Sequence, residues 1–85
     1  MIVKAKLAEI QDELTPLCEQ VSLKGYGPAS FIYAVNKGRA VEISEDNGGF
    51  WLEFWDRSDE DAAPVNEATV ASSEEAIQET RKWLK

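Results

Sequence analysis

The side chains that most often carry out catalysis are scarce in this 85-residue chain. It has no histidine, the commonest general base near neutral pH and a frequent metal ligand. Its one cysteine, Cys18, lies on a helical pattern beside Leu17, where a buried and unreactive thiol is expected. The sequence contains neither a glycine-rich phosphate loop nor a nucleophile motif. We therefore predict that the protein is not an enzyme and binds no cofactor or metal.

Two patterns of carboxylates are the remaining candidates for a ligand site. Glu42 and Glu53 are expected to lie opposite each other on neighbouring strands, as an acid–base pair or a cation site requires. A second set has the spacing of the first, third, fifth and twelfth positions of a calcium-binding EF-hand loop: Asp56, Ser58, Glu60 and Glu67. However, Asp61 stands where that loop needs glycine. Solvated carboxylates are the favoured interpretation, and a carboxylate-based enzyme or a cation or small-ligand binder is the least favoured alternative.

The formal net charge of −7 is concentrated in one stretch of the chain. Between residues 42 and 61 there are eight acidic residues and one basic residue, so this stretch alone carries −7. Such a field repels phosphate backbones and anionic lipids, and it attracts basic proteins and cations. We therefore predict a protein partner with a basic or mixed surface, and neither a nucleic acid nor a membrane as partner.

The composition is typical of one small domain over residues 1–85. The chain is 44% hydrophobic and 29% charged, which is too hydrophobic for a disordered protein. A single cysteine cannot form an internal disulfide, and the first residues lack the uncharged apolar run of a signal peptide. These features predict a soluble, cytoplasmic protein of the α+β class.

The first element expected is an amphipathic N-terminal helix. Its apolar residues recur at alternating steps of four and three: Val3, Leu7, Ile10, Leu14, Leu17 and Val21. Pro16 falls inside this pattern, and its missing N–H and its ring disfavour an uninterrupted helix. We predict that the helix kinks at Pro16, or restarts there with Thr15 as its N-cap.

An antiparallel meander of three or four strands is expected to follow, at residues 31–35, 39–45 and 50–56. The Asn47–Gly48 pair is typical of a tight hairpin turn, and it places Ile43 opposite Leu52. The signals at 65–71 are mixed, so a fourth strand there remains an alternative. The chain is expected to end in a helix over about 73–84, because Ser72 and the glutamate three residues later match a capping box.

The loop between the first two strands decides which side chains of residues 31–35 face the core. A three-residue loop at 36–38 places Phe31, Tyr33 and Val35 in the core, and this is the register that we predict. A two-residue loop at 37–38 would instead place Ile32 and Ala34 there, which is a slip of one residue.

The strand at 50–56 is apolar on both faces, and its second face carries the candidate functional residues. Trp51, Glu53 and Trp55 are expected to point away from the core, on the same side as Glu42. If the closing helix packs there, the two tryptophans belong to the core. If both helices lie on the other side, the tryptophans form a docking surface.

We predict a protein-interaction domain, such as an inhibitor or immunity-type protein or a subunit of a larger assembly. Trp51 and Trp55 would anchor the partner, and Glu42, Glu53 and Asp56 would steer it. The alternative is a homodimer formed through the same sheet face.

Overall fold

A computed structural model describes residues 3–26, 29–46, 48–56 and 64–84. The elements follow one another in this order: α1 (Val3–Leu14), a short 3-10 helix η1 (Thr15–Leu17), β1 (Gln20–Lys24), β2 (Phe31–Asn36), β3 (Arg39–Asp46), β4 (Gly49–Asp56), β5 (Asn66–Val70) and α2 (Ser73–Leu84). The predicted α+β arrangement, in which helices at the two ends of the chain enclose an antiparallel meander, is confirmed.

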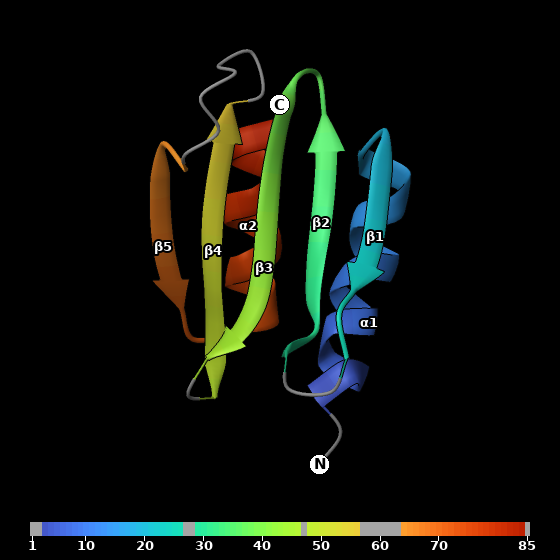
Figure 1. Cartoon of the computed structure of the whole chain (residues 1–85), viewed down its shortest axis with the longest axis vertical. Coiled ribbons are helices and arrows are strands. Elements are labelled where there is room, and N and C mark those ends of the chain that lie inside the picture. The colour runs from blue at the N-terminus through green and yellow to red at the C-terminus, as the bar shows by residue number, and fades with distance from the viewer. Residues whose placement is uncertain (1–2, 27–28, 47, 57–63, 85) are drawn as a thin grey trace.

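The strands form one antiparallel sheet in the order β1-β2-β3-β4-β5, so each strand pairs with its neighbour in sequence (Figure 1). This is one strand more than the larger of the two predicted numbers. The strand that was in doubt forms as β5 and pairs with β4. The strand that was missed is β1, where Val21 and Leu23 alternate with polar residues. Val21 had been assigned to the helix because it also fits the helical spacing.

The prediction that the first helix continues through Pro16 is wrong. Helix α1 ends at Leu14, Pro16 lies in η1, and Cys18 is already extended, with φ of −125° and ψ of 155°. The physical reason is that proline offers no N–H to the helical ladder and its ring clashes with the preceding turn. Thr15 is not an N-cap either, because its hydroxyl donates a hydrogen bond back to the Gln11 carbonyl (2.7 Å).

The predicted three-residue loop between the first two strands is also wrong. Lys37 and Gly38 form a two-residue turn with φ values of 52° and 79°, and both are positive as a type I′ turn requires. Ile32 therefore pairs with Ile43, and Ile32 and Ala34 enter the core instead of their neighbours. The Lys37 N–H donates to the Glu19 carboxylate (3.1 Å), which ties this turn to the segment before β1.

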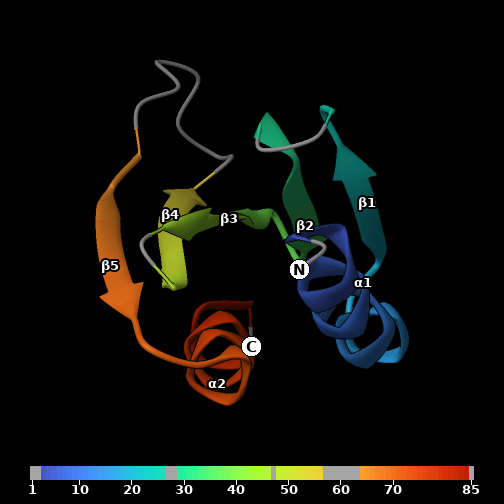
Figure 2. The same ribbon diagram turned by 90° about the horizontal axis from the view of Figure 1, so that it is seen from below.

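The predicted register of the next hairpin is confirmed. Ile43 pairs with Leu52 and Glu42 pairs with Glu53, with the turn closed between Asp46 and Gly49. Both helices lie on the same face of the sheet and run in the same direction (Figures 1 and 2). The core between the helices and the sheet consists of buried apolar side chains: Leu7, Ile10, Leu14, Ile32, Ala34, Val41, Ile43, Phe50, Leu52, Phe54, Ala76 and Leu84.

Hydrogen bonds hold both ends of α2. At its start, the Glu75 N–H donates to the Ser72 hydroxyl (3.2 Å), so the predicted N-terminal cap and the predicted bounds are confirmed. At its end, the Asn36 amide donates to the Leu84 carbonyl (2.9 Å) and the Arg39 guanidinium donates to the Trp83 carbonyl (3.2 Å). These bonds satisfy carbonyls that a helix terminus leaves without a helical partner.

The indole of Trp83 fastens α2 to the sheet. Its Nε1–H donates to the carbonyls of Ala40 and Trp55, each at 3.1 Å, and its ring lies 5.6 Å from that of Phe54. The Arg39 guanidinium covers the same indole at 4.6 Å from its centre. Because these contacts join the last turn of α2 to β3 and β4, they fix this helix on the core side of the sheet.

Candidate protein-docking face

The face of the sheet that points away from the helices is the candidate site, and we call it the open face. Neither helix covers it in the described part of the chain (Figure 2). Alternation along the strands and their register arrange its side chains in three cross-strand rows. The first row holds Gln20, Val35, Ala40 and Trp55; the second holds Ser22, Tyr33, Glu42, Glu53 and Glu67; the third holds Lys24, Phe31, Ser44, Trp51 and Thr69.

The middle row contains an acid row, which we define as Glu42, Glu53 and Glu67 on three adjacent strands. Like charges directly opposite each other in a sheet repel, so this arrangement costs stability. Partial burial raises the pKa of the Glu42 carboxyl, and the nearby charge of Glu53 raises this pKa further, whereas Lys24 lowers it. The ion pair seen among the described residues, Lys82 with Glu79, lies on α2 and does not neutralise the acid row. An added cation would therefore be favourable here.

Four aromatic side chains surround the acid row. Trp51 and Trp55 flank Glu53 on β4, and Phe31 and Tyr33 lie on β2. Trp51 is 37% exposed, which is high for so large an apolar side chain, and the other three are partly buried. Such a mixture of aromatic rings and charges is typical of the centre of a protein–protein interface.

Phe31 and Tyr33 were missed as surface residues because the predicted register of β2 was shifted by one. The signal that could have placed them is the Lys37–Gly38 pair, since glycine at the second position of a two-residue turn supports the type I′ geometry. Lys24 was missed with β1 itself. Its ammonium group lies 5.1 Å from the centre of the Tyr33 ring, so it forms part of the same face.

The two predicted tryptophan anchors are not equivalent. Trp55 shares its row with Val35 and Ala40, which are 7% and 0% exposed. The Nε1 of Trp55 is buried and has no hydrogen-bond partner among the described residues, while its carbonyl accepts a hydrogen bond from Trp83. Trp55 therefore has a structural part as well, and Trp51 is the more accessible of the two.

Asp56 does not join the other predicted site residues. It pairs with Arg39 at the end of β4 and, by alternation with Trp55, belongs to the side of the sheet that carries the helices. Four of the five predicted partner-binding residues therefore share the open face, and Asp56 is separated from them.

The chemical alternatives can be compared with the same geometry. The two cavities that line the α1–α2 side of the molecule include neither Glu42 nor Glu53. Within the described ranges, no group of three or more potential ligands is placed to hold a metal ion. The calcium-loop pattern falls largely at 57–63, outside the described residues. Burial raises the pKa of the Cys18 thiol, which disfavours the reactive thiolate.

Comparisons with protein-family models, curated proteins and solved structures gave no match to this chain. Neither of the described helices has the length and hydrophobicity needed to cross a membrane. Inferences about function therefore rest on the open face and on the charge of the chain.

Proposed function

We propose that this protein is a small acidic protein-interaction domain that binds a basic or mixed protein surface through its open face. The observation that carries the proposal is that both helices lie on one side of the sheet, while four aromatic side chains surround an acid row on the other. An inhibitor or immunity-type protein acting on a basic target would use such a face, and so would an acidic subunit of an assembly. A cytoplasmic setting is part of this proposal.

The size of the open face suits this role. Five strands spaced by about 4.8 Å give a width of roughly 19 Å, and eight residues of β4 give a length of roughly 27 Å, so the projected area is about 500 Å². A standard interface buries about 800 Å² on each partner. The open face would therefore supply most of one side of an interface of ordinary size.

The acid row would give the interface its charge preference. A guanidinium or ammonium group placed between Glu42 and Glu53 would remove their mutual repulsion, which the free protein does not relieve with an ion pair among the described residues. Because such binding favours ionised carboxylates, affinity should rise as the pH increases through the raised pKa of Glu42. Added salt should weaken binding.

The acid row also bears on the homodimer alternative. Two copies stacked face to face would bring their acid rows close together, and this repulsion would oppose association. We therefore expect a monomer in sedimentation experiments at micromolar concentration. A dimer that survives in Trp51→Ala at the same concentration would show that self-association uses another surface.

The test is capture of a partner from extract of the native cell, with the full chain immobilised at low salt. Wild type and Trp51→Ala should differ, because loss of a central tryptophan weakens binding by about 30-fold, or ~2 kcal/mol. Glu42→Gln with Glu53→Gln should lose the salt dependence of capture. The matched control is Tyr26→Ala, which removes a side chain that is 89% exposed and lies outside the described strands. Capture that is equal for wild type and Trp51→Ala would refute the proposal.

A further inference from the structure

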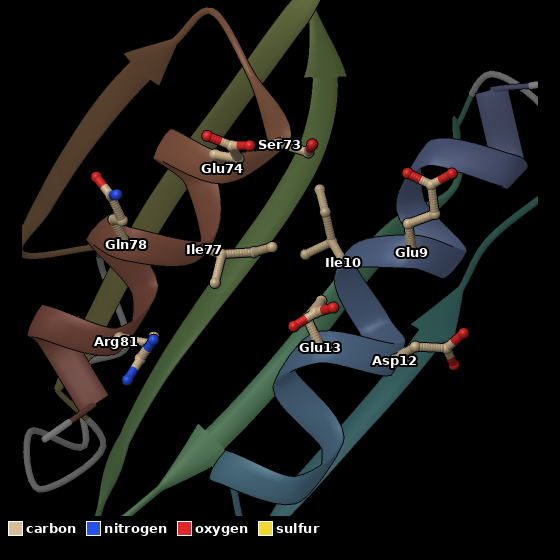
Figure 3. A pocket seen from close by; sticks show the side chains of 9 residues that line it. All are labelled: Glu9, Ile10, Asp12, Glu13, Ser73, Glu74, Ile77, Gln78 and Arg81. Carbon is tan, nitrogen blue, oxygen red and sulfur yellow. The ribbon is translucent and has the colours of Figure 1, made fainter.

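A groove lies between α1 and α2, on the helical side of the molecule (Figure 3). Its volume is about 580 Å³. Ile10 of α1 and Ile77 of α2 point toward each other across it and form an apolar floor. This site is separate from the open face, because the sheet lies between the two.

The walls of the groove carry mainly negative charge. Glu9, Asp12 and Glu13 come from α1, and Glu74 and Arg81 come from α2. All five side chains are exposed, and four carboxylates with one guanidinium leave a net charge of −3. Arg81 and Glu13 occupy facing walls (Figure 3), but within the described ranges no ion pair joins Arg81 to these carboxylates. The walls are therefore available to cationic side chains of another molecule.

The groove becomes apolar toward the ends of the two helices. Arg81 also borders a second cavity of about 200 Å³, whose lining includes Leu14, Leu17, Cys18 and Leu84. Leu17 is 45% exposed, although it is a large apolar residue. It lies in η1, which follows from the end of the helix at Pro16. Along α2 the surface therefore changes from acidic to apolar over about 18 Å, the length of a 12-residue helix.

We propose that this groove binds a basic amphipathic helix of a partner protein. Its cationic residues would lie against the acidic walls, and an apolar residue would enter the cavity beside Leu17 and Cys18. A groove between two parallel helices suits the ridge of a third helix, which places an apolar stripe on the floor and charged residues on the walls. The negative charge opposes phosphate-bearing ligands. With the open face, the protein would have binding surfaces on two opposite sides.

The probe for this site is a synthetic peptide of about 14 residues made of leucine and lysine, with the leucines at helical spacing so that they form one stripe. A peptide of the same composition in scrambled order is its control. Titrated into the full-length, isotope-labelled protein, the striped peptide should shift amide resonances of α1, η1 and α2. At saturation it should slow modification of Cys18, the only cysteine, by about fivefold or more. The scrambled peptide should bind about tenfold more weakly.

Charge reversal tests the acidic wall. Glu9→Lys with Glu13→Lys should weaken binding of the striped peptide by about tenfold or more. The control Asp46→Lys with Glu67→Lys makes the same change in net charge away from the groove and should stay within about twofold of wild type. Circular dichroism checks that each variant is folded. Shifts confined to the strands, an absence of shifts, equal binding of the scrambled peptide, or equal loss in both variants would each overturn the proposal. Trp51→Ala should bind the peptide normally, so this site can fail independently of the open face.

Discussion

Replacing Glu42 with glutamine should stabilise the folded protein at neutral pH. Glu42 lies directly opposite Glu53, and burial and this neighbouring charge both raise the pKa of its carboxyl. A carboxyl whose pKa is higher in the folded chain than in the unfolded chain holds its proton more tightly when folded. Its stabilising contribution is therefore complete below the unfolded pKa and is lost as the pH rises through the folded pKa. At pH 7 the ionised Glu42 carboxylate thus costs stability.

The expected gain for Glu42→Gln at pH 7 is about 0.2–1 kcal/mol, the range for a cross-strand like-charge pair. The lower half of this range applies because Glu42 and Glu53 are both partly exposed and solvent screens their charges. A gain of ~0.5 kcal/mol would raise Tm by roughly 2–4 °C in a domain of this size. At pH 4 the gain should largely disappear, because the raised pKa leaves the Glu42 carboxyl mostly protonated in the folded wild type.

Urea unfolding followed by tryptophan fluorescence at pH 7 and pH 4 measures this difference. The matched control is Glu13→Gln on α1, an exposed carboxylate away from the sheet, which should change the free energy of unfolding by less than about 0.5 kcal/mol. Loss of stability in Glu42→Gln at pH 7 would refute the reasoning, since it would mean that the carboxylate is well paired. An equal gain at both pH values would also refute it. Stabilisation together with weaker partner binding would mark the acid row as a functional feature.

Three further variants test the fold that positions the site. Trp83→Phe should destabilise the protein by about 2–3 kcal/mol in urea unfolding, because the carbonyls of Ala40 and Trp55 lose their indole donor; a loss below ~0.5 kcal/mol would mean that Trp83 does not fasten α2. Lys37→Asn should stabilise by about 0.5 kcal/mol in the same assay, since asparagine tolerates the positive φ of 52° better; a loss of stability would contradict the two-residue turn. Ser72→Ala should cost about 1 kcal/mol and lower Tm, because the Glu75 N–H loses its cap; an unchanged Tm would show that the cap is unimportant.

Local signals were sufficient for the second half of the chain. The bounds of α2 followed from the Ser72 cap and the helical spacing, and the register of β3 with β4 followed from the turn at Asn47–Gly48. Both depend on residues close in sequence, where turn geometry and capping act directly. The presence of Trp51, Glu53 and Trp55 on one side of β4 was predictable for the same reason.

The first half of the chain required information that its local patterns do not contain. Val21 fits both a helical and an alternating spacing, and its pairing with Ala34 of β2 selects the strand. The register of β2 depended on whether its loop had two residues or three, and a difference of one residue moves every side chain to the other face. Phe31 and Tyr33 were therefore assigned to the core, although they belong to the open face.

The composition of the open face was thus largely set by alternation along β3 and β4, because side-chain direction in a strand is a local property. That this face is open depends on where α2 packs, which is a long-range property. The Trp83 indole bonded to Ala40 and Trp55, and the Asn36 and Arg39 side chains at the last carbonyls of α2, hold this helix beside α1. Those partners lie 28 to 48 residues away along the chain, so no local pattern could have indicated them.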